Sequence, residues 1–106
     1  MRILSGISVV GLLLAIGFGF LTMAGLLDVN THIGISLVGI LIALLTHMLG
    51  KEGRDLLAAL LLLLVIASGL AAFSGLLSGF AHMVIAILAT AGSIWGHTRR
   101  FLSLPS

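Results

Sequence analysis

The sequence contains no cysteine, a single proline and few charged residues. Without cysteine, the chain forms no disulfide, carries no c-type haem attachment motif and holds neither an iron–sulfur cluster nor thiolate-bound zinc. Charged residues make up 8% of the 106 positions, against about 25% in a soluble domain. The chain therefore lacks the polar surface of a water-soluble protein, and its five basic residues form no dense patch for nucleic acid.

The hydrophobic residues, 60% of the chain, fall into runs long enough to cross a membrane. Residues 3–27 carry no charge and are longer than the apolar region of a signal peptide, so we interpret them as a spanning helix. Residues 56–98 would form a helix of about 64 Å, twice the thickness of the hydrocarbon core, so this run must fold back at Ser74–Gly79. The pattern predicts one transmembrane domain, residues 1–106, with helices over 4–27, 31–50, 55–73 and 79–98.

The basic residues flank the predicted helices on one side only. They are Arg2, Lys51, Arg54, Arg99 and Arg100. The opposite loops contain Asp28, which is well placed as a helix N-cap, and no basic residue. The positive-inside rule therefore predicts a multi-pass protein of a bacterial inner membrane with both termini in the cytoplasm. The segment Lys51–Asp55 is interpreted as a solvated turn followed by a helix start.

The sequence matches itself when it is shifted by 50 residues. The shift places Gly19 on Gly69, and it also aligns leucine runs, a Gly-Leu-Leu segment and all four histidines. The match indicates a duplicated helical hairpin, with repeat 1 at residues 1–50 and repeat 2 at residues 51–100. The expected fold is an all-α, transmembrane up-down-up-down four-helix bundle.

Four histidines occupy matching places in the two repeats. His32 and His47 bracket the second predicted helix, and His82 and His97 bracket the fourth, and the members of each pair are 15 positions apart. Because these helices should run in the same direction, His32 and His82 share one depth, and His47 and His97 share another about 22 Å away. The sequence thus predicts an outer and an inner histidine pair, one near each face of the membrane.

A histidine pair on facing helices is suited to a b-type haem. Neutral imidazole is an axial ligand of haem iron, and helical bundles build cofactor sites from facing side chains. The hypothesis places an outer haem iron between His32 and His82 and an inner one between His47 and His97, giving two haem b. Fifteen residues leave a helical position about 60° out of phase, so the haems should be rotated relative to each other, or a π-bulge should absorb the offset.

A flat macrocycle also needs glycines where neighbouring helices meet it, because side chains would clash there. Gly25 and Gly75 are expected at the outer level and Gly11 at the inner level, although ordinary helix packing is the alternative for such glycines. Candidate partners of the inner haem propionates are Arg99, Arg100, Arg54 and Lys51, and those of the outer propionates are Asn30, Thr31 and Ser78.

This pattern of histidines and glycines resembles the di-haem four-helix bundle of the cytochrome b family, and designed membrane haem bundles follow the same logic. In that family, histidine pairs on the second and fourth helices hold two haems, and glycines lie on the first and third helices. The likeness covers the whole chain as architecture. The chain departs from the family in having fourteen residues between the ligands on both helices and in lacking the later helices and the quinol-site loop. The resemblance therefore implies haem binding and electron transfer, and does not extend to quinol oxidation.

The residues alone leave three functions open. The first is a cytochrome that carries electrons across the bilayer, with a quinone, a redox protein or a larger complex as its partner. The second is a cofactor-free structural or assembly subunit in contact with lipid and other subunits. The third is a histidine-based metal or proton transporter, which is disfavoured because no Asp or Glu is expected inside a span. No nucleophile, acid–base pair or nucleotide motif marks the chain as a stand-alone enzyme.

Overall fold

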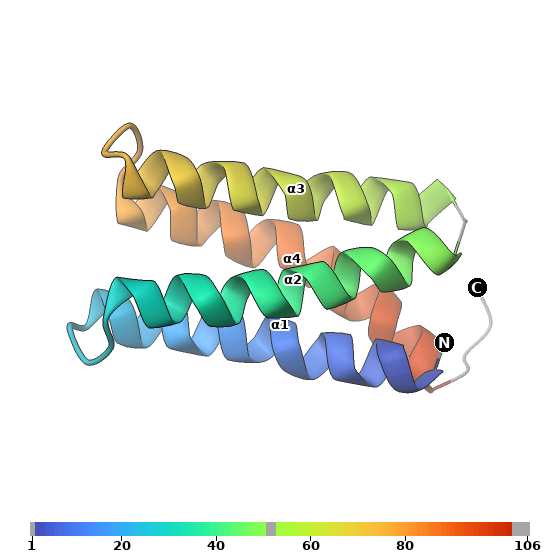
Figure 1. The fold of residues 1–106 in the computed structure, drawn as a ribbon. Coiled ribbons are helices and arrows are strands. Elements are labelled where there is room, and N and C mark those ends of the chain that lie inside the picture. The colour runs from blue at the N-terminus through green and yellow to red at the C-terminus, as the bar shows by residue number, and fades with distance from the viewer. Residues whose placement is uncertain (1, 51–52, 103–106) are drawn as a thin grey trace.

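Four long helices account for almost all of the described chain. The computed structural model describes residues 2–50 and 53–102, without the side chain of residue 54. The helices are α1 (Arg2–Met23), α2 (Val29–Gly50), α3 (Gly53–Phe73) and α4 (Gly79–Phe101). Unbroken apolar runs favour this outcome, because a helix satisfies its backbone hydrogen bonds internally when no water is present. The all-α prediction is confirmed (Figure 1).

Glycines end the first and third helices. Gly25 has a φ of +77°, and the amide of Leu26 donates to the carbonyl of Leu21 at 2.9 Å, which closes a Schellman turn. Gly75 has a φ of +80° in the equivalent turn after α3. Helix α1 consequently ends at Met23, four residues before the predicted end at residue 27. Gly25 and Gly75 thus shape the two turns, because a residue with a side chain adopts a positive φ only with strain.

Polar caps set the starts of α2 and α4. The carboxylate of Asp28 accepts a hydrogen bond from the amide of Thr31 at 3.1 Å, which confirms Asp28 as the N-cap of α2. The hydroxyl of Ser78 accepts from the amide of Ala81 at 3.0 Å in the same way. Helix α4 continues to Phe101, beyond the predicted end at residue 98, and includes both of the arginines placed after it.

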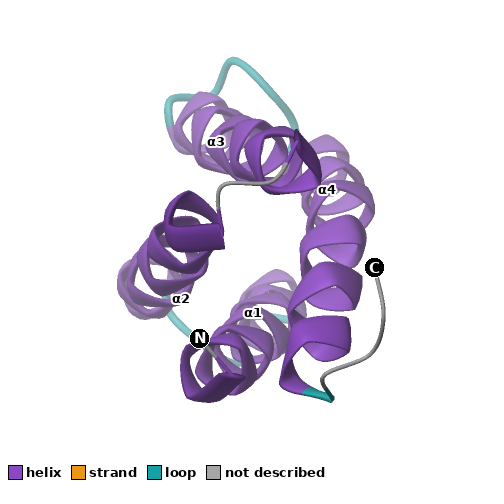
Figure 2. Cartoon of the chain, turned by 90° about the vertical axis from the view of Figure 1, so that its right-hand side faces the viewer, coloured by secondary structure: helices purple, strands orange, loops and turns teal. Residues whose placement is uncertain are grey.

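The helices form a ring in which each packs against its two neighbours in the order α1, α2, α3, α4 (Figure 2). Helices α2 and α4 therefore face each other across the bundle. The α1–α2 and α3–α4 connections lie at one end, here called the turn end (Figure 1). The start of α1, the end of α2, the start of α3 and the end of α4 lie at the other, here called the terminal end. The long axis measures 40 Å, close to the roughly 40–45 Å of a bilayer with its interfaces.

A small apolar core occupies the middle of the bundle. Leu12 and Leu62, which are equivalent in the 50-residue repeat, are both fully buried, and Ile40 and Val65 pack with them. Most large apolar side chains instead point outward on all four helices. All four helices are long and apolar enough to cross a membrane. An outer surface of this kind is suited to contact with lipid rather than water.

Candidate functional site

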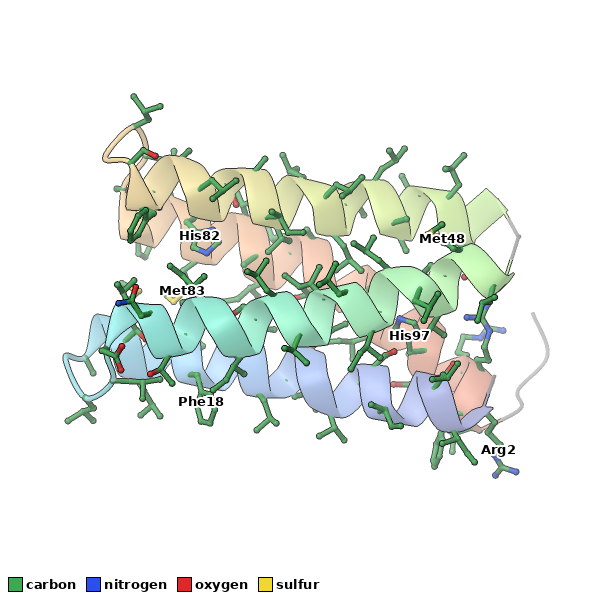
Figure 3. The ribbon with its side chains drawn as sticks, viewed as in Figure 1. Arg2, Phe18, Met48, His82, Met83 and His97 are labelled. Atoms are coloured by element: carbon green, nitrogen blue, oxygen red, sulfur yellow. The ribbon has the colours of Figure 1, made fainter. Side chains whose placement is uncertain are left out.

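The four histidines lie at two levels with different surroundings. His32 and His82 lie toward the turn end, whereas His47 and His97 lie toward the terminal end, where Figure 3 shows His97. Helices α2 and α4 are α-helical from end to end, so no π-bulge absorbs the offset predicted from the spacing. Each second histidine is therefore turned by about 60° relative to the first. The two levels consequently face different parts of the bundle.

An internal cavity of about 460 Å³ extends from the turn end to the middle of the bundle and is partly open to the outside. Residues from all four helices line it, and both His32 and His82 are among them. Most other lining residues are apolar: Leu12, Ile16, Ile40, Val65, Phe73 and Met83. Figure 3 shows His82 and Met83 projecting into the bundle in this region. The volume falls within the range of about 300–1,000 Å³ that is typical of small-molecule and cofactor sites.

Two glycines lie against the turn-end histidine rings. A Cβ atom on Gly19 of α1 would come within 3.1 Å of Cε1 of His32, and one on Gly69 of α3 within 3.2 Å of Cε1 of His82. These distances are shorter than ordinary van der Waals contact, so any side chain at either position would press on the ring. The residues of one contact match those of the other when the sequence is shifted by 50 positions. The glycines therefore let each imidazole lie flush against the helix beside it.

Serine hydroxyls hold the Nδ1 atoms of the same rings. The Ser68 hydroxyl donates to the carbonyl of Val65 and lies 2.9 Å from Nδ1 of His82. When Nδ1–H of His82 donates to this hydroxyl, the Nε2 atom of the neutral ring carries a lone pair. The Ser36 hydroxyl lies 3.2 Å from Nδ1 of His32. An imidazole anchored through Nδ1 with a free Nε2 is in the state that binds a metal.

The turn-end site fits a haem between two imidazoles. It combines an apolar space of cofactor size with two lining histidines that are oriented by hydrogen bonds. The propionate partners predicted for this level lie elsewhere: Thr31 bonds to Asp28, Ser78 caps α4, and Asn30 is exposed. The polar residues that do line the cavity besides the histidines are Thr22, Ser36 and Thr90.

A buried hydrogen-bonded group, here called the terminal-end cluster, occupies the other level. It comprises His47, Asp55, Ser93, His97 and Arg100. Nδ1 of His47 lies 2.9 Å from the Asp55 carboxylate, and Nε2 lies 2.8 Å from the Ser93 hydroxyl. Arg100 donates to both carboxylate oxygens of Asp55 at 3.0 Å. The cluster therefore joins α2, α3 and α4 through charged and polar groups.

The interpretation of Asp55 as part of a solvated turn was wrong. Asp55 is only 3% exposed, and its carboxylate lies between His47 and Arg100. Helix α3 begins at Gly53, so Asp55 falls in the first turn and faces the bundle interior. Gly50 makes room for it, because a Cβ atom there would overlap the carboxylate and the guanidinium. One carboxylate thus lies within a helix long enough to span, contrary to the prediction of spans free of Asp and Glu.

His97 completes the cluster by ring contact instead of hydrogen bonding. Its ring centroid lies 4.1 Å from that of His47, with the planes inclined by 35°. His97 is fully buried, and neither of its ring nitrogens has a hydrogen-bond partner among the described residues. Rings in direct contact leave no space for a flat macrocycle between them. The second haem predicted at His47 and His97 therefore does not fit this arrangement.

The order Asp55, His47, Ser93 follows the connectivity of a hydrolase triad, in which a carboxylate orients a histidine that binds a serine hydroxyl. Ser93 is fully buried and does not line the internal cavity. A triad requires its nucleophile to reach a substrate carbonyl beside an oxyanion-binding site. The buried position of Ser93 therefore favours a structural role for this relay over hydrolysis.

The structure separates the other predicted site residues from the histidines. A Cβ atom on Gly11 would meet the Cα atom of Gly39 at 3.1 Å, so Gly11 serves the close packing of α1 against α2. Gly25 and Gly75 lie in the turns, where an added Cβ would meet nothing within 4 Å. Arg99 lies over the ring of Trp95 at 5.7 Å, and Arg100 binds Asp55. Lys51 and the side chain of residue 54 fall outside the described residues.

Sequence reasoning missed the residues that contact the histidines. These are Gly19, Gly69, Ser36, Ser68, Asp55 and Ser93. The match between Gly19 and Gly69 at a shift of 50 positions could have indicated these two glycines. Glycine is less common in this chain than leucine, so a glycine match is less often accidental. The serines carried no such signal, since neither Ser68 nor Ser93 has a serine at its equivalent position.

The part of the chain that the structure describes contains no group of three or more His, Asp or Glu side chains able to hold a metal ion. A zinc ion, which takes four ligands in structural sites and three in catalytic ones, is therefore poorly served. Two imidazoles match the requirement of a haem iron, whose porphyrin supplies the remaining ligands.

Comparisons with protein-family models, with curated proteins and with solved structures found no match to this chain.

Proposed function

We propose that the chain is a b-type haem protein of a membrane, with an iron held by His32 and His82 at the turn end. The observation that carries the proposal is a cavity of about 460 Å³ bounded by all four helices and lined by both imidazoles. Each ring is backed by a glycine and bonded through Nδ1 to a serine. An apolar pocket with a few convergent polar groups is the usual form of a cofactor site.

The chain is then an electron carrier or a redox subunit rather than a stand-alone enzyme. Haem supplies reversible one-electron chemistry when bound. His32 and His82 would hold the iron, the apolar lining of the cavity would limit its contact with water, and Ser68 would orient the ring of His82 through Nδ1. A quinone, a redox protein or a larger complex would serve as electron donor and acceptor.

The proposed architecture is a duplicated helical hairpin with up-down-up-down topology. Support comes from features that recur 50 residues apart: the glycine–histidine contacts, the positive-φ glycines and the buried leucines.

The proposed orientation places both termini in the cytoplasm of a bacterial cell. It rests on the basic residues, among which Arg2, Arg99 and Arg100 all belong to the terminal end.

A cofactor-free structural subunit is the competing function. The terminal-end cluster gives it some support, because its hydrogen bonds tie three helices together without any ligand. This function leaves the turn-end cavity unexplained, since a purely structural bundle is expected to fill its interior with side chains. The proposal of a haem site explains both the cavity and the glycines beside it.

The visible spectrum of the full chain, purified in detergent from haem-replete cells, tests the proposal. We expect a sharp Soret band and a reduced α band of the b type. His32→Ala and His82→Ala should each abolish these bands, whereas Gly34→Ala should retain them, because a Cβ atom at that position meets nothing within 4 Å. A colourless, folded wild-type preparation would contradict haem binding and favour the structural subunit.

A further inference from the structure

The two histidine levels differ in whether an imidazole nitrogen is available to a ligand. At the turn end, His32 and His82 line a cavity, and Nδ1 is the ring atom of each that is hydrogen-bonded to a described residue. At the terminal end, both nitrogens of His47 are engaged, one by Asp55 and the other by Ser93. Because a carboxylate only accepts hydrogen bonds, Nδ1 of His47 is a donor, and Nε2 of the neutral ring accepts from Ser93. The Nε2 lone pair of His47 is therefore engaged by Ser93, and an iron would have to displace this hydroxyl.

The space at the terminal end is filled by the rings themselves. The ring centroids of His47 and His97 lie 4.1 Å apart, and neither residue lines the internal cavity. His47 is 3% exposed and His97 is fully buried. Interiors packed to this degree do not admit a macrocycle without movement of whole helices. A haem here would have to separate the rings and break both hydrogen bonds of His47.

Charge pairing adds to the cost of opening the cluster. The carboxylate of Asp55 binds Arg100 through two hydrogen bonds of 3.0 Å and His47 through one of 2.9 Å. In apolar surroundings, removing a partner from such a pair leaves an uncompensated charge, which is strongly destabilising. Nearby, the hydroxyls of Ser8 and Thr46 lie 3.2 Å apart and link α1 to α2. The terminal end is thus held closed by contacts among all four helices.

We infer that the chain binds a single haem, at the turn end, and that the terminal-end cluster is a hydrogen-bonded clamp instead of a second haem site. This inference rests on the proposed function, since it assigns the number and the place of the haems that function requires. It replaces the two-haem path across the bilayer that the four histidines predict. Histidine placement in the sequence is symmetric, but the partners are not: Ala43 stands at the position equivalent to Ser93, and Gly50 at the position equivalent to Arg100.

The number of haems per chain tests the inference. Haem content of the purified wild-type chain is measured by the pyridine haemochrome spectrum against protein mass, together with His82→Ala and His97→Phe, two changes on α4. We expect one haem per wild-type chain and loss of haem in His82→Ala. We expect full retention in His97→Phe, because phenylalanine preserves the ring contact and His97 makes no hydrogen bond to the described residues. A redox titration should show one single-electron wave.

Each contrary result has a distinct meaning. Two haems per chain, or a haem content halved by His97→Phe, would overturn the inference while leaving the proposed haem function intact. One haem that is lost in His97→Phe and kept in His82→Ala would also overturn it, by moving the site to the terminal end. A colourless wild type would overturn the proposed function and the inference together.

Discussion

The imidazole rings of His47 and His97 touch across the bundle, with centroids 4.1 Å apart, yet only one of them is hydrogen-bonded to described residues. His47 binds Asp55 and Ser93, whereas the ring nitrogens of His97 face no such partners. The two histidines match when the sequence is shifted by 50 positions, but their surroundings differ. The positions that match Ser93 and Arg100 hold Ala43 and Gly50, which have no side-chain hydrogen-bonding group.

Ser68→Ala should weaken haem binding at the turn end. The change removes the hydroxyl that is hydrogen-bonded to Nδ1 of His82 at 2.9 Å and orients the ring. Loss of such a partner typically lowers the affinity of a metal site by about 10–100-fold. Haem titration of the apo-protein in detergent measures the effect. Ser36→Ala is the matched control and should have a smaller effect, because its contact with His32 is longer, at 3.2 Å. Equal affinities for all three proteins would contradict the assigned role of Ser68.

Gly19→Val should reduce haem affinity by at least about tenfold, by displacing an axial ligand. A Cβ atom at residue 19 would lie 3.1 Å from Cε1 of His32, so the larger side chain must push the ring toward the cavity. Gly17→Val is a close control on the same helix, where a Cβ atom meets nothing within 4 Å. Both variants replace glycine by valine within α1 and so change helix propensity equally. A difference in haem affinity between them therefore reports the contact with the His32 ring. If the two variants bind haem alike, Gly19 does not position His32.

Asp55→Asn should destabilise the bundle strongly, by about 3–5 kcal/mol, because it leaves Arg100 without its charged partner in apolar surroundings. The carboxylate also holds Nδ1 of His47 at 2.9 Å, and an amide can replace only part of this bonding. Unfolding in mixed detergent micelles, followed by circular dichroism, gives the free-energy difference. Asp28→Asn is an exposed control and should change stability far less. A small effect of Asp55→Asn would argue against the clamp.

Gly75→Ala should destabilise the protein by about 1–2 kcal/mol, because alanine resists the left-handed conformation that this turn requires. The φ of Gly75 is +80°, and an added Cβ meets nothing within 4 Å, so the whole effect is backbone strain. Gly79→Ala lies four residues away at the start of α4 and should be neutral or slightly stabilising. The same unfolding assay compares the two. Identical stability of the two variants would rule out strain at residue 75.

Stability should fall in acid through Asp28. Hydrogen bonds from the hydroxyl and the amide of Thr31 hold the pKa of Asp28 below its ordinary value of 3.8. Because the pKa is lower in the folded chain, the stabilisation is present above pH 3.8 and is lost as the pH falls through the folded pKa. Asp28→Asn should remove this part of the pH dependence, and Thr31→Val should weaken it. The free energy of unfolding is measured for both proteins at several pH values below 5. If it falls equally in the wild type and in Asp28→Asn, Asp28 is not responsible for the acid sensitivity.

Hydropathy and spacing were sufficient to predict the helices and the pairing of histidines by depth. Charge-free runs longer than a bilayer is thick must cross it or fold back, and this constraint involves only the length of the run. Residues 15 apart on a helix have a defined separation along its axis, which places His32 and His47 at different levels. The caps at Asp28 and the turns between residues 24 and 28 and between 74 and 78 likewise depend on neighbouring residues alone.

Tertiary structure decided what each histidine meets. The prediction that Gly25 lies at the outer haem level assumed that α1 runs to residue 27, but the Schellman turn ends the helix at Met23, and Gly19 lies beside His32. Contacts of Ser68, Ser93 and Asp55 depend on how far each helix is rotated about its own axis. In helices that are apolar on every face, the sequence contains little information about that rotation. Packing of all four helices together sets it, which is why one histidine pair lines a cavity and the other closes on itself.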